Sequence, residues 1–302
     1  MSHDDHRAEV REFLSSRRAR VAPEQAGLAA YGGNRRVKGL RREEVAMLAG
    51  VSVDYYVRLE RGNLSGASDG VLDSLAGALQ LDEAEREHLF SLARAAGPAR
   101  RRTHARTGAV RPAVQQMLDA IGDAPAWVCN GRHDILASNR MGRALYAPVF
   151  ADPRRPANTT RFIYLDPAAR DFFVDWERVA NDAAAMLRLE AGRNPHDREL
   201  IQLVGELSTR SELFRGRWAS HDVVFHRSGR KRLRHPVVGQ LDLSFESMKL
   251  PSEPVLYLNV YTAPAGSPTA DALRLLSSWA ATQDAEQLPE PDRAGAESRG
   301  EA

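Results

Sequence analysis

The segment LRREEVAMLAGVSVDYYVRLERG, residues 40–62, decides the fold of the N-terminal part of this chain. Apolar residues recur at helical spacing in its first half, which predicts a short amphipathic helix. Gly50 then allows a tight turn, and Ser52 is a good N-cap for a second helix that runs to about Arg61. Small Ala46 lets the two helices cross closely. A helix, a glycine turn and a capped helix at this spacing predict a helix-turn-helix.

The second helix of such a motif lies in the DNA major groove, and the first helix crosses the DNA backbone. We expect the inward face of the second helix to carry Val53, Tyr56 and either Leu59 or Glu60. Candidates for contacts to base edges are the outward residues Ser52, Asp54, Tyr55 and Arg58. Candidates for phosphate contacts are the basic residues in and beside the motif, namely Arg35, Arg36, Lys38, Arg41, Arg42 and Arg61.

The charge around the motif favours nucleic acid as a partner. Between Phe13 and Arg42 the chain has eight basic residues and one acid, Glu24. Such a cluster attracts phosphates and releases counterions when it binds nucleic acid. Taken alone, the cluster would be a solvated basic loop, as is common in arginine-rich chains. The adjacent helix-turn-helix favours double-stranded DNA.

Further helices complete an all-α domain around the motif. An amphipathic segment from about residue 6 to residue 21 precedes it. After it, Ser68 or Asp69 can cap one helix, and Asp82 with Glu85 resembles a capping box at the start of another. These signals predict a five-helix DNA-binding domain.

Length and composition predict two domains in a soluble protein. A chain of 302 residues exceeds what one hydrophobic core usually serves. No apolar run approaches the ~20 residues of a membrane span, and the charged start MSHDDHRAEV is unlike a secretory signal. The single cysteine, Cys129, excludes an intrachain disulfide and favours a reducing cytoplasm. Because Cys129 is next to Trp127 and Val128, we interpret it as a buried, inert thiol, and a redox role stays open.

Composition also marks the domain boundaries. We place the helix-turn-helix domain at residues 1–97 and a linker at residues 98–110, where arginine-rich sequence could also touch phosphates. A second domain follows at residues 111–282. The remaining residues 283–302 are rich in Asp, Glu, Pro, Gly and Arg, which predicts a disordered tail.

The second domain mixes strand and helix patterns. Short β-like runs PAWVCN and DILASN flank Gly131, helical stretches follow at about 171–193, 197–209 and 211–219, and period-2 strands return in QLDLSFESM and VLYLNVYTA. HRSGRK, residues 226–231, is a plausible hairpin turn before those strands. Strands, a helical block and antiparallel strands predict an α+β domain whose sheet is covered on one side by helices.

These blocks together resemble a known family. Residues 40–62 followed by VLDSLAGALQLDEAEREHLFSLA resemble the helix-turn-helix domain of the XRE class, in the branch that carries a MmyB-like ligand-binding domain. The same resemblance continues, in order, through RFIYLDPAARDFFVDWERVA, LVGELSTRSELFRGRWASHDV, HPVVGQLDLSFESMKLP and LYLNVYTAPAGS. It covers about Val10 to Trp279. It implies a PAS-like C-terminal domain that senses a small, often hydrophobic molecule, with a fatty-acid-like ligand as one possibility.

A sheet roofed by helices can enclose an apolar cavity, although core packing is the default role of each aromatic side chain. The candidate pocket residues are Trp127, Arg161, Phe162, Phe173, Trp176, His221, Phe245 and Tyr257. Arg161 could pair with a carboxylate ligand or with an acid of the protein such as Asp175 or Glu177.

Polar residues of the second domain give no sign of an enzyme. His221, Asp222 and His235 could be drawn as a metal site or a catalytic dyad, but their spacing is unremarkable. No HExxH, GxSxG, Walker or GxGxxG motif accompanies them. We therefore expect no metal, no cofactor and no catalytic residue, and assign these histidines to hydrogen bonding or to anchoring a polar ligand head group.

The sequence thus predicts a transcription regulator that binds a two-fold-related operator as a homodimer. Its second domain would set the geometry between the two DNA-binding heads, and a ligand would shift that geometry. Two other functions stay open: an enzyme attached to DNA that acts on a small metabolite, and a dimerisation module without a ligand.

Overall fold

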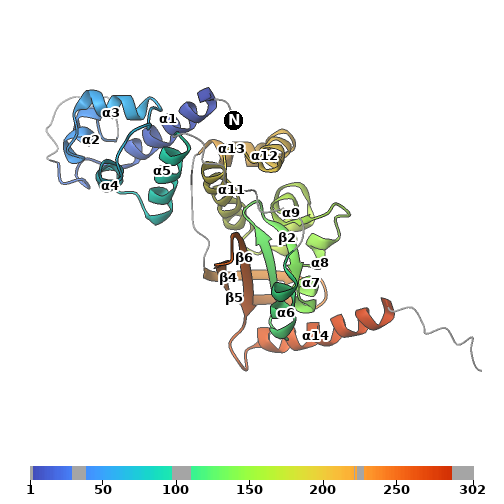
Figure 1. Ribbon diagram of the computed structural model, residues 1–302. Coiled ribbons are helices and arrows are strands. Elements are labelled where there is room, and N and C mark those ends of the chain that lie inside the picture. The colour runs from blue at the N-terminus through green and yellow to red at the C-terminus, as the bar shows by residue number, and fades with distance from the viewer. Residues whose placement is uncertain (1–2, 29–38, 97–109, 221, 223–227, 288–302) are drawn as a thin grey trace, which may run out of the picture.

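Helices alone build the N-terminal domain over the residues that the structure describes. The computed structural model describes residues 3–28, 39–96, 110–220, 222 and 228–287 (Figure 1). The first helices are α1 His3–Arg20, α2 Arg42–Leu48, α3 Val53–Glu60, α4 Asp69–Ala78 and α5 Glu83–Ala95. The predicted five-helix domain is confirmed.

Local signals set where these helices begin and end. Gly50 lies between α2 and α3 with φ +66°, a conformation that favours glycine. The Ser52 side chain accepts a hydrogen bond from the backbone N–H of Tyr55, and Ser68 caps α4 in the same way. Asp82 and Glu85 form the predicted capping box at the start of α5. The turn and the caps predicted from the sequence are all present.

One inward residue of α3 was assigned wrongly. Tyr56, Leu59 and Glu60 are buried, but the Val53 side chain is 45% exposed. Val53 is the first residue of α3, directly after the turn, and the face that packs into the core begins only at Tyr56. Val53 therefore belongs to the surface of α3.

A buried carboxylate joins the first three helices. Glu60 of α3 is 1% exposed and accepts hydrogen bonds from Arg18 Nε of α1, at 2.7 Å, and from Arg42 Nε of α2. Tyr56 Oη lies 3.4 Å from the same carboxylate. A buried charge is tolerated when it is paired and hydrogen-bonded, so this group fixes α3 against α1 and α2.

We expect Glu60→Gln to lower the free energy of unfolding by about 2 kcal/mol or more, because two guanidinium groups lose their anionic partner. Urea unfolding of the full chain measures this loss. The matched control is Glu43→Gln, since Glu43 pairs with Arg41 in an exposed position and such pairs contribute about 0.5 kcal/mol. Equal losses in both variants would contradict the role given to Glu60.

The C-terminal domain is built on a curled antiparallel sheet of order β3-β2-β1-β6-β5-β4. The strands are β1 Ala126–Asn130, β2 Asp134–Ser138, β3 Ala157–Asn158, β4 Ser228–His235, β5 Gly239–Leu250 and β6 Glu253–Thr262. The predicted α+β class is confirmed. The hairpin turn predicted in HRSGRK is wrong, because Ser228 to Lys231 are paired with β5 and the turn lies at residues 236–238, before Gly239 with φ +75°.

Helices cover both faces of this sheet. On one face lie α7 Arg140–Leu145, α8 Ala147–Phe150, α9 Thr159–Leu165, α10 Ala168–Phe172, α11 Trp176–Arg193 and α14 Pro268–Gln287. On the other face α6, Pro112–Ala120, packs Val114 and Leu118 against Val128 and Leu258. The predicted one-sided cover is therefore corrected. Helix α13, Glu212–Ala219, lies against α11, and α12, Arg198–Arg210, lies against α13 and α9 (Figure 1).

Two predicted boundaries also change. The single helix expected at 171–193 is broken after α10, where Phe173 forms a bridge to Leu233 of β4. Residues 283–287, which were expected in the tail, belong to α14, because this helix continues to Gln287. Most of the predicted linker, and residues 288–302, lie outside the described residues.

Helix α11 also joins the two domains. It packs against α5 (Figure 1). Leu189 of α11, 3% exposed, belongs to the hydrophobic core of the N-terminal domain. Arg188, buried beside it, forms an ion pair of 2.5 Å with Glu9 of α1. The two domains therefore share one helix and a continuous interface.

Candidate DNA interface and ligand-binding domain

The outward face of α3 presents the residues predicted to read bases. Ser52, Asp54 and Arg58 are exposed, and Tyr55 is half-buried. The Arg58 guanidinium lies over the Tyr55 ring, 4.7 Å from its centroid, so the two side chains hold one another in place. Ser52 is engaged in the helix cap through its hydroxyl oxygen. Arg58 and Tyr55 are thus the pair best arranged to enter a groove.

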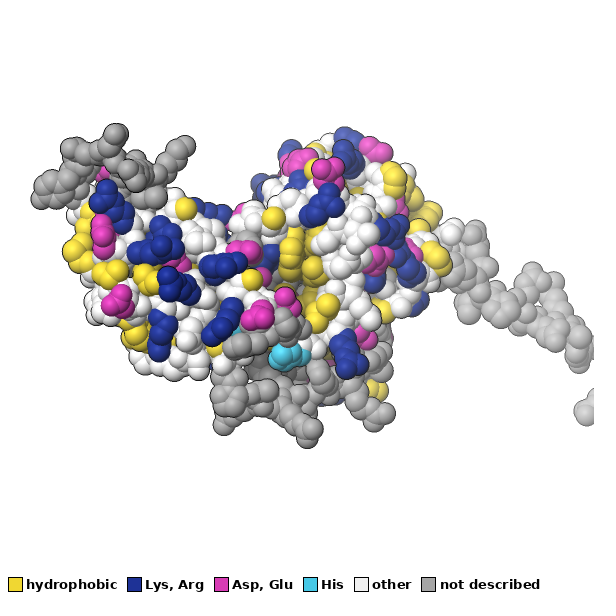
Figure 2. Space-filling model, turned by 90° about the horizontal axis from the view of Figure 1, so that it is seen from above, with side chains coloured by type: hydrophobic (Ala, Val, Ile, Leu, Met, Phe, Trp, Pro, Cys, Tyr) yellow, Lys and Arg dark blue, Asp and Glu magenta, His cyan; other side chains and the backbone are white. Residues whose placement is uncertain are grey.

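The predicted phosphate contacts differ in their surroundings. Arg41 and Arg61 are exposed, and basic side chains gather over this domain (Figure 2). Arg42 donates a hydrogen bond to buried Glu60, and this contact raises the pKa of Arg42. Arg42 therefore orients α3, although its own side chain stays half exposed. Arg35, Arg36 and Lys38 lie outside the described residues. The surface around α3 can thus offer several cations to a DNA backbone.

We expect Arg58→Ala to remove about 1–3 kcal/mol of discrimination between the operator and a mismatched site. Arg61→Ala should instead weaken binding to all sequences alike. It should also reduce the slope of log affinity against log salt concentration by about 1, the value expected when one phosphate contact is lost. Fluorescence anisotropy with both DNA fragments at several salt concentrations separates the two effects. The assignment fails if Arg61→Ala alters sequence preference and Arg58→Ala does not.

Most candidate pocket residues of the second domain pack against one another. Trp127, Phe162, Phe173, Trp176 and Phe245 belong to one core cluster and are at most 8% exposed. Tyr257 lies apart from this cluster, with its hydroxyl 3.1 Å from Arg193 Nη1. His221 lies outside the described residues. The structure thus brings five of the candidates together as a core, and one of the five, Phe162, also lines a pocket.

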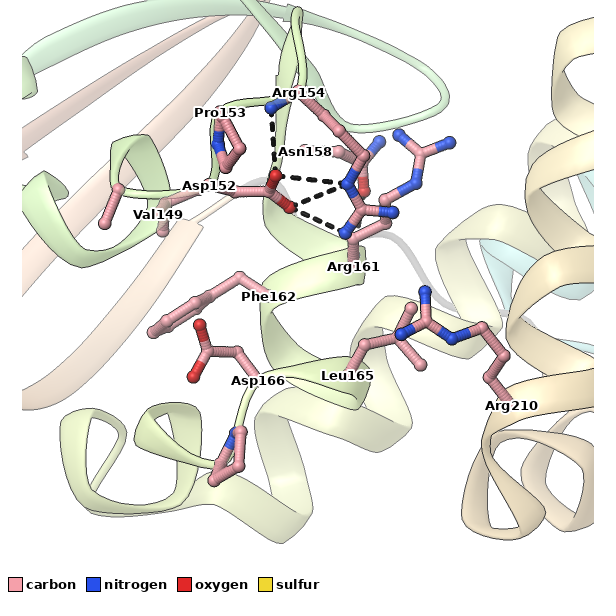
Figure 3. A pocket seen from close by; sticks show the side chains of 12 residues that line it. Val149, Asp152, Pro153, Arg154, Asn158, Arg161, Phe162, Leu165, Asp166 and Arg210 are labelled. Carbon is pink, nitrogen blue, oxygen red and sulfur yellow. Dashed lines mark hydrogen bonds and ion pairs between the residues drawn. The ribbon is translucent and has the colours of Figure 1, made fainter.

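That pocket, of about 340 Å³, opens between α9 and the end of α12 (Figure 3). Its apolar surface includes Val149, Phe162 and Leu165, and Figure 3 shows the Phe162 ring directed into it. Arginines lie along the rim. Of the residues predicted from the sequence, Arg161 and Phe162 line this pocket.

The arginines of the rim are already paired. Arg154, Arg161 and Arg210 all donate to Glu206 of α12, at 2.8, 2.8 and 3.0 Å. Arg154 also donates to Asp152 through Nε and Nη2, and these hydrogen bonds lower the pKa of Asp152 to about 2 (Figure 3). The partner of Arg161 is therefore Glu206, not Asp175 or Glu177, which pair with Arg232 and Arg217. In sequence, only the four-residue spacing of Glu206 and Arg210 signals this network.

The residues that could suggest catalysis have structural partners. Both ring nitrogens of His235 are hydrogen-bonded, to the Ala144 carbonyl at 3.0 Å and to the Val237 N–H at 3.2 Å. Asp222 pairs with Arg17 and Arg20 of α1. Over the described residues, no group of three or more His, Cys, Asp or Glu side chains could hold a metal ion. The hydrogen-bonding role predicted for His235 is confirmed.

A buried histidine, which sequence reasoning missed, follows the β1–β2 turn. His133 is 8% exposed, with Nδ1 2.7 Å from Thr160 Oγ1, and burial lowers its pKa to about 4. The folded domain thus holds a neutral imidazole at pH values where the unfolded chain takes up a proton. Its φ of +66° is one that asparagine also tolerates.

We therefore expect the domain to lose stability as the pH falls from about 6.5 to about 4. His133→Asn should make this decline shallower, because one group that binds protons only when unfolded is removed. Thermal unfolding at pH 7, 5.5 and 4.5 measures the difference between the two proteins. An unchanged pH profile in His133→Asn would contradict the assignment.

Ionic contacts between the domains accompany the burial of Leu189. The Arg188 guanidinium lies 4.1 Å from the Trp218 ring centroid of α13 and pairs with Glu9 of α1. Arg193 of α11 pairs with Glu87 of α5 at 2.6 Å. Helices α11 and α13 therefore hold α1 and α5, the helices that support the helix-turn-helix.

An exposed helix-turn-helix joined to a separate α+β domain defines a DNA-binding regulator with a ligand-binding module. Comparison with protein families agrees: a helix-turn-helix domain matches residues 9–89, and the MmyB-like transcription regulator ligand binding domain matches residues 110–276. The chain belongs to the MmyB-like transcription regulators. Among curated proteins no relative matches it. No helix over the described residues is long and apolar enough to cross a membrane.

Proposed function

We propose that this regulator binds a specific operator as a homodimer and that a small, hydrophobic molecule, bound in its C-terminal domain, changes its affinity for DNA. The observation that carries the proposal is the shared helix α11, which contributes Leu189 to the core of the DNA-binding domain and Val179 and Ala183 to the core under the sheet. A change in the second domain that moves α11 must also move α5.

Base reading is assigned to Ser52, Asp54, Tyr55 and Arg58, and phosphate contact to the surrounding arginines. Exposure of α3 and the stacking of Arg58 on Tyr55 support this assignment. Two-fold symmetry of a dimer would place two such helices about one DNA turn apart, ~34 Å. An operator with inverted half-sites at that spacing is therefore expected.

The pocket beside Phe162 supports ligand binding. Its inner wall continues into the aromatic core, because the Phe162 ring lies 6.1 Å from Phe173 and 5.8 Å from Phe172. Its rim joins α9 to α12 through Arg161 and Glu206. A ligand that separates these two side chains would shift α12 and α13, and α13 carries the Trp218 that holds Arg188. Fatty-acid-like molecules are one class with the required apolar body.

A regulator is favoured over an enzyme by the same observations. Both nitrogens of His235 serve the fold, and both matched families are regulatory modules. The ligand must bind the DNA-competent and the DNA-incompetent arrangements with different affinity, because a ligand that binds both equally leaves their populations unchanged.

The test is binding of the purified full chain to DNA that flanks its own gene, at several salt concentrations, followed by a thermal-shift screen of small apolar molecules. We expect specific binding that weakens steeply with salt. We also expect at least one stabilising compound that changes operator affinity about 5- to 150-fold. Stabilising compounds that never alter operator affinity would contradict the sensing role.

The coupling itself can be tested with Glu9→Gln, which leaves α1 intact but removes the anion that Arg188 contacts. We expect the effect of such a compound on operator affinity to shrink severalfold, because α11 is held less firmly to α1, while binding of the compound itself is unchanged. Asp4→Asn, an exposed change on the same helix, is the control. Unaltered coupling in Glu9→Gln would remove this interface from the mechanism.

A further inference from the structure

The first turn of α3 exposes an apolar side chain between two residues that are assigned to base reading. Val53, the first residue of the helix, is 45% exposed and lies between Ser52 and Asp54 in the chain. In a helix-turn-helix, the residues near the N-terminus of the second helix are the ones that reach base edges. Val53 therefore occupies a position from which a side chain reaches bases, although it offers no hydrogen bond.

Val53 is part of an apolar edge of α3. Val57 follows one turn later, so it is the neighbour of Val53 on the helix surface, and it is half-buried. Over the described residues, the hydrophobic core of this domain includes neither valine. Asp54 and Arg58, each one residue further along the chain, form a parallel polar row. The outward surface of α3 thus combines an apolar edge with hydrogen-bonding side chains.

The valine at this position is explained better by an external contact than by the fold. Single exposed apolar residues are common, but a β-branched side chain lowers helix propensity, so Val53 brings no gain to the short helix α3. The same branching leaves Val53 one strongly preferred rotamer in a helix. Little side-chain entropy is then lost when another molecule covers it. Val53 is therefore pre-arranged for an apolar contact.

Thymine is the base that offers an apolar group in the major groove. Its C5-methyl lies at the base edge there, where the other bases present hydrogen-bond donors and acceptors. Tyr55 is the other candidate for an apolar contact in the first turn of α3. However, Tyr55 packs against the core of the domain, and the Arg58 guanidinium lies over its ring. Val53 thus offers the more accessible apolar surface.

We propose that Val53 reads a thymine in each half-site of the operator, through van der Waals contact between its methyl groups and the C5-methyl of that base. The inference rests on the proposed operator binding and adds a thymine-specific contact to it. Another base at the same position would place polar edge atoms against the valine, which cannot hydrogen-bond to them. Such atoms lose water without gaining a partner, so these sites bind more weakly.

Replacement of thymine by uracil tests the contact, because it removes the methyl group and keeps the base pairing and the O4 acceptor. The full chain first selects its operator from a pool of random DNA duplexes, and each thymine of the selected site is then replaced in turn. Fluorescence anisotropy measures the affinity for each duplex. At one position in each half-site we expect uracil to weaken binding about fourfold, the value for one buried carbon group.

The variant Val53→Ala links this effect to the valine. We expect it to bind the thymine operator more weakly than wild type does. Uracil at the same position should then weaken its binding by less than about twofold, because the methyl group has already lost its apolar partner. Val255→Ala is the matched control and should keep the full uracil effect, since Val255 of β6 is equally exposed, at 45%, and lies in the other domain. Thermal unfolding checks that both variants fold.

Two results would overturn the inference alone. Either no uracil substitution weakens binding of the wild-type protein, or Val53→Ala keeps the full uracil effect at every thymine. The first result needs no variant, so it does not depend on how Val53→Ala folds. In both cases the chain still selects an operator, and the proposed function stands. A chain that selects no operator from the pool would overturn the proposed function and this inference together.

Discussion

Helix α11 buries side chains in three separate clusters, and this constrains every other part of the chain. Val179 and Ala183 face the aromatic core under the sheet, Leu187 packs with α12 and α13, and Leu189 enters the core of the helix-turn-helix domain. Gly192 permits the last of these contacts, because a Cβ there would lie 2.5 Å from the His88 ring of α5. A rigid helix shared in this way cannot turn in one domain without moving the other.

The arginines of this chain differ in the acids with which they pair. Arg18 and Arg42 satisfy Glu60 and so fix the recognition helix, while Arg188 and Arg193 reach acids of the other domain. A guanidinium suits these buried and interfacial roles because it stays charged and offers several donors in a fixed plane. Arg58, stacked on Tyr55, forms no ion pair with an acid among the described residues, which is compatible with the DNA contact proposed for it.

Sequence reasoning succeeded where the signal was local. The Gly50 turn and the Ser52, Ser68 and Asp82 caps each involve neighbours a few residues apart, so the helix-turn-helix domain could be predicted closely. It failed where partners are distant. Nothing near Arg161 in sequence points to Glu206, and period-2 alternation was hidden in β4, where the basic residues around Gly229 resemble a turn. The exposure of the α3 residues to which base reading is assigned was accessible to prediction, whereas the pocket rim and the domain interface depend on tertiary contacts.

The nature of the domain interface bears on how a ligand could act. Leu189 is held in an apolar core, a contact that persists in any arrangement close to this one, whereas Arg188 and Arg193 reach the other domain through ion pairs with Glu9 and Glu87. Ion pairs between long side chains depend on position within a few tenths of an ångström to keep their hydrogen-bond geometry. A small shift of α11 would therefore exchange ionic partners before it exposed apolar surface. Allosteric coupling free energies are typically about 1–3 kcal/mol, which corresponds to a change in affinity of about 5- to 150-fold, and the coupling proposed for this interface would have to lie in that range.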